Sequence, residues 1–167
     1  MRILLYAVAL VLVTSCEVLP LDHFEPREVK WFNGIQDNNF DTLVDKFVEV
    51  AHENGVDLEY IYNPENEINI ELVANYEWAG TAHARDNNEL IHITINEEVY
   101  NQMAPLSRWT LLFHELGHDV LNYAHRGGHS IDSLELMHQA KNRNIRNADE
   151  LKAALDMMFT HYKINLN

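Results

Sequence analysis

The pattern of apolar and polar positions divides the chain into an apolar start, a polar stretch and a long part with regular periods. Apolar residues recur at helical spacing from Asn39 to Asn54, and Gly55 follows where a helix C-cap belongs. Three later segments have the apolar content and alternation of strands, with turn-forming residues between them. These segments are 68–73, 77–84 and 90–95. We therefore predict a helix followed by a small sheet.

Two further helices follow the predicted strands. From Pro105 to Asn122 the apolar residues cover almost the whole circumference of a helix, so we expect this helix to be buried on most sides. The last helix is predicted to begin near Asn147, with Glu150 three residues later as a capping-box partner. This order of elements predicts an α+β fold. A small mixed sheet would pack on the N-terminal helix and the buried helix, with the C-terminal helix completing a compact domain.

Composition limits the classes of function. The 167 residues include 12 basic and 26 acidic side chains, which give a formal charge of -14. Because phosphate binding needs a basic surface, we expect no nucleic-acid partner. A single cysteine allows neither an internal disulfide nor a cysteine-rich zinc site. Any metal site must therefore use histidine and carboxylate ligands. We expect one domain and a monomer.

The first fifteen residues differ from the rest of the chain. An uncharged apolar run follows Arg2 and stops at Cys16. The run is shorter than the roughly 20 residues that a membrane-spanning helix needs, so it is predicted to be a targeting segment. Its last residues, VTSC, resemble the lipobox of bacterial lipoproteins, which implies cleavage before Cys16 and lipid on its thiol. The alternative is an ordinary secretory signal with a chance cysteine.

The predicted organisation has three parts. Residues 1–15 are a lipoprotein signal peptide, residues 16–38 are a tether that contains two prolines and no sustained period, and residues 39–167 are the folded domain. The protein would thus be exported. Lipid on Cys16 would anchor an otherwise soluble domain at a bacterial cell membrane or outer membrane.

The predicted buried helix contains the sequence HELGH. His114 and His118 are four residues apart, so their side chains lie one turn apart on one face of a helix and can hold one metal ion. Glu115 projects beside that pair, where a carboxylate can take a proton from a metal-bound water. Gly117 costs about 1 kcal/mol in a helix relative to alanine, which indicates close packing at this position. The buried helix is therefore the candidate site of chemistry.

This combination resembles the zincin metallopeptidases, and among them the metzincins. In the pattern of that family, HExxHxxGxxH, the glycine turns the chain out of the helix and the last histidine completes a His₃ zinc site. The strict pattern fails here, because Leu121 and Ala124 stand at those two positions. The spacing returns one residue later. Asn122 can adopt a left-handed conformation that ends the helix, and His125 follows three residues beyond it. We predict His125 as the third ligand.

Several residues remain open as alternatives or additions to this site. Rival third ligands are His129, Asp132 and Glu135, the last by resemblance to the gluzincins, whose third ligand is a downstream glutamate. Metzincins also place a methionine in a turn beneath the zinc, and Met137 stands at a suitable place for that Met-turn. Ordinary core packing is the alternative reading of Met137.

Two further roles have no single candidate. Asp119 either orients an imidazole or is an exposed helix acid. The group that would stabilise an oxyanion is open among Tyr123, His138, His161 and Tyr162.

The resemblance implies a zinc-dependent peptidase. Zinc would activate a water, Glu115 would be the general base, and a peptide or protein would be the substrate. The substrate backbone would pair with an edge strand, expected at Leu90–Ile95 because zincins place such a strand just before the active helix. Two other functions stay open: a lipid-anchored zinc-binding protein without catalysis, and an inactive zincin-like interaction module. Glu115 favours the enzyme over a metal store, whereas the imperfect motif keeps the inactive module open.

Overall fold

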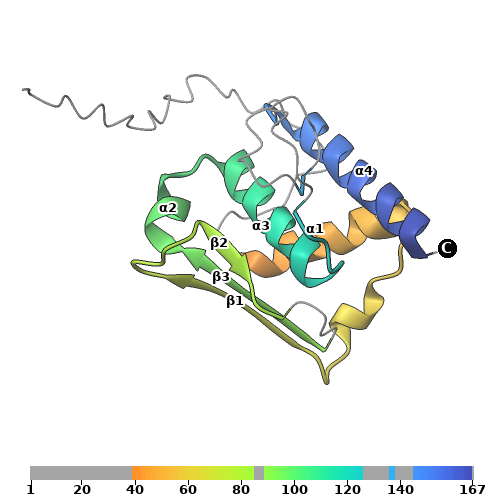
Figure 1. The fold of residues 1–167 in the computed structure, drawn as a ribbon, viewed down its shortest axis with the longest axis horizontal. Helices are drawn as coiled ribbons and strands as arrows, with labels where there is room; N and C mark the ends of the chain where they lie inside the picture. Colours follow the sequence, from red (N-terminus) through yellow and green to blue (C-terminus); the bar gives the residue numbers. More distant parts are fainter. Residues whose placement is uncertain (1–38, 85–88, 126–135, 138–144, 167) are drawn as a thin grey trace, which may run out of the picture.

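The computed structural model describes residues 39–84, 89–125, 136–137 and 145–166. It has the predicted α+β class, with a three-stranded mixed sheet and helices packed against it (Figure 1). The elements in chain order are α1 (Phe40–Glu53), the 3₁₀ turn η2 (Glu59–Tyr62), β1 (Glu67–Val73), β2 (Gly80–Ala82), β3 (Leu90–Asn96), α2 (Glu97–Gln102), α3 (Pro105–Asp119) and α4 (Ala148–Leu166). The predicted signal peptide and tether, with Cys16, lie outside the described residues. Within the described ranges, no helix has the length and apolar content needed to cross a membrane.

Helix α1 forms where the apolar periodicity predicted it. The side chain of Asn39 caps its start by accepting hydrogen bonds from the backbone N–H groups of Asp41 (3.0 Å) and Thr42 (3.4 Å). Beyond its C-cap, Gly55 has a φ of +70°, the left-handed conformation that glycine adopts without steric cost. The apolar face carries Phe47 into the core. Its ring packs on aromatic rings of both α3 and α4, so α1 is joined to both helices.

The sheet has the order β1-β3-β2. Strand β1 pairs with β3 in parallel, and β2 pairs with β3 antiparallel. Alternate residues of β3, among them Ile93, enter the core, while Thr94 and Asn96 on the opposite face are also buried. Burial on both faces is typical of a central strand, and β3 is one.

The prediction that Leu90–Ile95 is the edge strand is therefore wrong. It relied on chain order, because this segment precedes the buried helix directly. In space, however, the segment predicted as 77–84 forms the shorter strand β2 and adds to the side of β3 opposite β1. The edge strand that contacts α3 is β2.

Helix α3 lies at the centre of the fold. It contacts β2 and β3 on one side and α1 and α4 on the other (Figure 1). Leu112, Phe113 and Leu116 have no exposed surface, as expected for a helix that is apolar almost all round. The helix begins at Pro105 as predicted but ends at Asp119, three residues earlier than predicted. The polar side chains of α3 therefore lie between the sheet on one side and α1 and α4 on the other.

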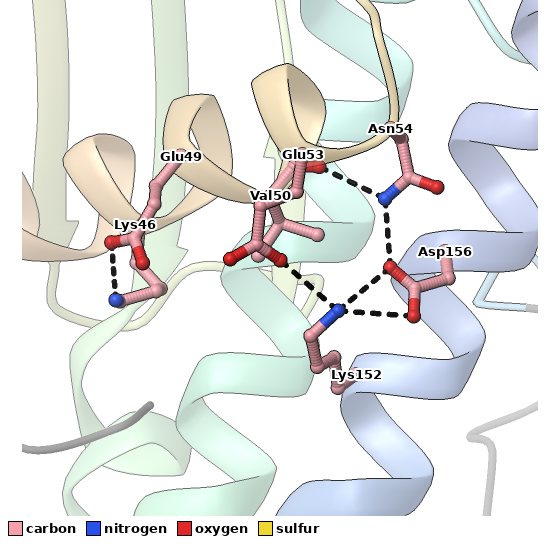
Figure 2. Close-up of polar contacts among 7 residues, drawn as sticks. All are labelled: Lys46, Glu49, Val50, Glu53, Asn54, Lys152 and Asp156. Atoms are coloured by element: carbon pink, nitrogen blue, oxygen red, sulfur yellow. Dashed lines mark hydrogen bonds and ion pairs between the residues drawn. The ribbon is translucent and has the colours of Figure 1, made fainter. Parts of the chain in front are cut away.

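Polar contacts join the end of α1 to α4 (Figure 2). The Nζ atom of Lys152 lies 3.1 Å from Oε2 of Glu53 and 3.0 Å from Oδ1 of Asp156. The side-chain amide of Asn54 donates to the same Asp156 oxygen at 2.7 Å. Helix α4 starts as predicted, since the side chain of Asn147 accepts a hydrogen bond from the N–H of Glu150. These contacts and the aromatic core fix α4 on the side of α3 away from the sheet.

Candidate metal centre

Three imidazole nitrogens converge at the end of α3. The Nε2 atoms of His114 and His118 are 3.1 Å apart, and the Nε2 atom of His125 lies 3.1 Å and 3.0 Å from them. Among the residues that the structure describes, these three side chains form the one group of His, Cys, Asp and Glu that could hold a metal ion. The structure thus brings together the three histidines predicted as ligands.

The second nitrogen of two of these rings is fixed by a backbone carbonyl. The Nδ1–H of His114 donates to the carbonyl oxygen of Leu136 at 2.7 Å, and the Nδ1–H of His118 donates to that of Tyr123 at 2.6 Å. Because a carbonyl oxygen can only accept, these contacts fix each ring orientation and leave Nε2 as the coordinating atom. Both rings therefore aim Nε2 at the same point.

The triangle of Nε2 atoms fits a tetrahedral metal. Zinc–nitrogen bonds of about 2.0–2.1 Å in a tetrahedron place two ligand nitrogens about 3.3 Å apart. Burial lowers the pKa of His114 to about 4, so at neutral pH its Nε2 carries a lone pair. Lone pairs that face each other at 3.1 Å repel unless a cation lies between them. The three histidines can hold a metal ion, and three ligands leave the fourth tetrahedral position open.

The turn after α3 explains how His125 reaches the other two histidines. Asn122 has a φ of +55°, the left-handed conformation predicted from its sequence position. The next residue, Tyr123, donates its N–H to the carbonyl of Gly117 at 3.1 Å, so the chain folds back over the last turn of the helix. One turn thus supplies both the carbonyl that orients His118 and the third histidine.

Gly117 lies where two methionine side chains meet α3. A Cβ atom at Gly117 would lie 2.5 Å from Sδ of Met137 and 3.1 Å from Sδ of Met158. The predicted close packing is therefore real, and its partners are side chains from outside the helix. Met137 is buried directly after Leu136, whose carbonyl orients His114. Met137 therefore packs in the core, and its role in a Met-turn stays a prediction.

Glu115 is buried on α3, with only 5% of its surface exposed. Burial raises the pKa of Glu115 to about 7, against a lowering effect of the hydrogen bond that its carboxylate accepts from the backbone N–H of Ala82. Its Oε1 atom would be 2.8 Å from a Cβ atom at Gly80. The carboxylate of the residue that follows His114 is thus in direct contact with β2. A buried carboxylate of this kind can act as a general base.

Asp119 is buried, with 1% exposed, so the alternative of an exposed helix acid is wrong. Its Oδ2 atom accepts backbone hydrogen bonds from Ala84 (3.2 Å), just after β2, and from His92 (3.3 Å) in β3. Burial raises the pKa of Asp119 to about 6 despite these bonds. Its Oδ1 atom has no hydrogen-bond partner in the described part of the chain. The carboxylate fastens the end of α3 to the sheet.

The candidates for stabilising an oxyanion and the rival third ligands are only partly within the described residues. The hydroxyl of Tyr123 donates to the carbonyl of Met158 at 3.1 Å, so it is used in fastening the turn to α4. Tyr162 stacks edge-on against the ring of Tyr123, and His161 is half-buried on the same helix. The rest of the candidates lie outside the described residues: His129, Asp132, Glu135 and His138.

Sequence reasoning missed the backbone groups that surround the histidines and Glu115. Only Gly80 carried a signal, because an isolated glycine at a strand often marks a close approach of another group. Comparison with known proteins adds nothing to this geometry: no family model, no curated protein and no solved structure matches the chain. Function is therefore inferred from the centre itself.

Proposed function

We propose that the protein is a zinc-dependent peptidase in which His114, His118 and His125 hold the zinc ion and Glu115 is the general base. The observation that carries this proposal is the convergence of three Nε2 atoms within 3.0–3.1 Å of one another. Two backbone carbonyls orient two of the rings toward that point. A metal store needs no buried carboxylate beside its ligands, so the position of Glu115 favours catalysis.

Zinc suits these ligands better than the hard cations. Imidazole nitrogens bind zinc and other transition metals, whereas calcium and magnesium require oxygen ligands. Three protein ligands and one open position are typical of catalytic zinc sites. Bound zinc would polarise a peptide carbonyl and lower the pKa of a coordinated water.

The chain supplies the proton transfer and the substrate contact. Glu115 would take the proton of the attacking water and return it to the leaving amine. A peptide substrate would bind beside β2, because this strand and not β3 is the edge next to α3. A peptide bond there would pass close to Glu115, whose side chain contacts Gly80 of that strand.

Zinc content tests the metal site. Residues 17–167 would be purified, incubated with zinc, dialysed and subjected to elemental analysis as the parent, His125→Ala and His52→Ala. His52 is a suitable control because it is exposed in the last turn of α1. We expect about one zinc per chain in the parent and the control, and substantially less in His125→Ala. A folded parent that binds no zinc would contradict the proposal and favour the alternative function, an inactive interaction module.

Peptide hydrolysis tests the chemistry. A library of internally quenched fluorescent peptides would be offered to the parent and to Glu115→Gln, a variant that keeps the shape of the side chain and the acceptor for Ala82. We expect Glu115→Gln to retain zinc and to lose kcat by about 10²–10⁴-fold, the usual contribution of a general base. Zinc binding without hydrolysis in the parent would instead indicate the zinc-binding protein.

The membrane anchor is a separate proposal. We propose that lipid on Cys16 holds the domain at a bacterial membrane, supported by the apolar run and the VTSC sequence. Replacing Cys16 with serine should move the protein from the membrane fraction to the soluble fraction in a bacterial host. If the parent and Cys16→Ser both fractionate with the membrane, lipid on Cys16 is not what anchors the protein.

A further inference from the structure

The outer edge of β2 is directed away from the rest of the sheet. On the inner edge of β2, which faces β3, the backbone N–H of His83 donates to the carbonyl of His92 at 2.8 Å. The backbone N–H of Asn96 donates to the carbonyl of Ala79 at 3.1 Å. In an antiparallel pair, alternate residues direct their N–H and C=O groups to the partner strand. The peptide groups of the intervening residue Ala82 therefore point to the outer edge.

Two carboxylates of α3 contact the backbone N–H groups of this strand and of the residues after it. The N–H of Ala82 donates to Glu115, and the N–H of Ala84 donates to Oδ2 of Asp119. Glu115 and Asp119 are four residues apart, so they lie on one side of the helix, one turn from each other. Helix α3 thus holds backbone donors that an additional strand would otherwise pair with.

Gly80 contributes space. A Cβ atom there would lie 2.8 Å from Oε1, 3.0 Å from Cγ and 3.1 Å from Cδ of Glu115. The backbone of Gly80 is outside the left-handed region, where among the described glycines only Gly55 lies. An alanine could therefore adopt this backbone conformation. What requires glycine is the volume that the Glu115 side chain occupies.

We propose that Gly80 and Ala82 are positioning residues for Glu115: the N–H of Ala82 fixes one side of the carboxylate, and the missing side chain of Gly80 gives it the space in which it is held. This inference rests on the proposed function, because it assumes that Glu115 acts as the base. A glutamate side chain loses about 1.5–2 kcal/mol of rotamer entropy when it is fixed. The contacts with β2 meet that cost before substrate binds, so the base is already oriented.

Gly80→Ala tests the proposal, with Glu67→Ala as the control. Glu67 is exposed on β1, the edge strand on the other side of β3 from β2. In Gly80→Ala we expect the parent's zinc content, a KM within about threefold of the parent, and a kcat lower by about 10²-fold, the effect of displacing a catalytic group by about 1 Å. Glu67→Ala should keep the parent's kcat. A parent-like kcat in Gly80→Ala would overturn the proposal.

Amide hydrogen exchange gives a second test that needs no activity. In zinc-loaded protein, the Ala82 amide should exchange about tenfold faster in Glu115→Ala than in the parent, whereas the Ala84 amide, held by Asp119, should not change. Equal protection of Ala82 in both proteins would overturn the positioning role even if the parent hydrolyses peptides. If the parent hydrolyses nothing while Ala82 protection depends on Glu115, the proposed function and the positioning role are both overturned. The hydrogen bond between Ala82 and Glu115 would then be a structural contact only.

Discussion

At the residue scale, the histidines depend on backbone groups that no side-chain motif encodes. His114 is oriented by the carbonyl of Leu136, and His118 by the carbonyl of Tyr123. Neither acceptor can be removed by a side-chain substitution. Each can be displaced, however, through the contacts that hold its own segment in place. Gly117 and Asn122 are the two positions through which such a displacement can be made.

Replacing Gly117 with alanine should destabilise the protein and weaken zinc binding. Alanine gains about 1 kcal/mol in helix propensity, but its Cβ would lie 2.5 Å from Sδ of Met137, and overpacking of a core costs about 1–3 kcal/mol. We expect a net loss of about 1 kcal/mol in the free energy of unfolding, measured by urea denaturation without zinc. Zinc affinity, measured against a chelating dye, should fall about tenfold because Leu136 moves with Met137.

The control is the same substitution in a Met137→Ala background. Without the methionine side chain, the nearest atom to the added methyl group is Sδ of Met158 at 3.1 Å, a tight contact that a small shift of this flexible side chain relieves. Gly117→Ala should then stabilise the protein by up to about 1 kcal/mol. If Gly117→Ala has the same effect in both backgrounds, the contact with Met137 does not determine the cost.

Tyr60 should make the protein sensitive to alkaline pH. Burial, with contributions from Tyr162 and Asp119, raises the pKa of Tyr60 from 10.0 to about 12. A raised pKa means that the folded state favours the neutral phenol. The stability that this contributes is complete below pH 10 and is lost as the pH rises from 10 to about 12.

Tyr60→Phe should remove this part of the pH dependence. We expect the loss of unfolding free energy between pH 9 and pH 11.5 to be smaller in the variant, by on the order of 1 kcal/mol because the group is only partly buried. Urea denaturation at a series of pH values measures the difference. An unchanged alkaline slope in Tyr60→Phe would contradict the prediction.

Residue spacing predicted the histidine cluster but could not predict its supports. The four-residue interval placed His114 and His118 on one face, and counting from Asn122 identified His125. The carbonyls of Leu136 and Tyr123 are backbone groups, and any residue type could have supplied them. The burial of Asp119 was also missed, because an acid at the end of a helix ordinarily lies in solvent.

At the element scale, period and caps predicted the helices, whereas the strand order was not predictable. Helix α1 and the start of α4 follow from apolar spacing and asparagine caps. The six-residue helix α2 was missed because it is too short to show a period. Strand β3 was placed at the edge because chain order alone does not reveal that β1 and β2 pair with it on opposite sides. That error placed the predicted substrate contact at the central strand β3 and not at the edge strand next to α3.

The turn after α3 predicts a coupling between helix termination and zinc binding. Asn122 has a φ of +55°, a conformation that costs most residues about 1–2 kcal/mol and asparagine less. Asn122→Ala should lower the free energy of unfolding by about 1 kcal/mol and weaken zinc affinity about tenfold, because Tyr123 and His125 follow in the same turn. Urea denaturation and chelator competition measure the two effects.

Asn122→Gly is the matched control, because glycine adopts the left-handed conformation without steric cost. It should bind zinc as the parent does. Equal zinc affinity in the alanine and glycine variants would show that the backbone conformation of this turn does not position His125.

At the scale of the whole molecule, a metal at this centre would hold together the end of α3, the turn after it and, through His114, the segment that contains Leu136. The histidines come from α3 and the turn after it, and the carbonyl that orients His114 comes from the segment that precedes α4. Unfolding would have to separate these parts. Ligand binding to the native state alone therefore adds stability.

Zinc should raise the melting temperature of residues 17–167. At a free zinc concentration 100 times the Kd, the gain is about 2.7 kcal/mol, which corresponds to roughly 5–10 °C for a domain of this size. Differential scanning fluorimetry measures the shift. Magnesium should produce none, because it requires oxygen ligands, and His125→Ala should lose most of the zinc effect. A similar shift with magnesium would show that the stabilisation does not arise at the histidines.

The contact of two methionine sulfurs with Gly117 also determines how the centre responds to oxidants. Conversion of Met137 to its sulfoxide adds a polar oxygen to a sulfur atom that lies where even a methyl group on Gly117 would not fit. The oxidised side chain would have to leave its place, and Leu136, with the carbonyl that orients His114, would move with it. Loss of the metal would then follow oxidation of a residue that never touches it, and methionine sulfoxide reduction would restore the site.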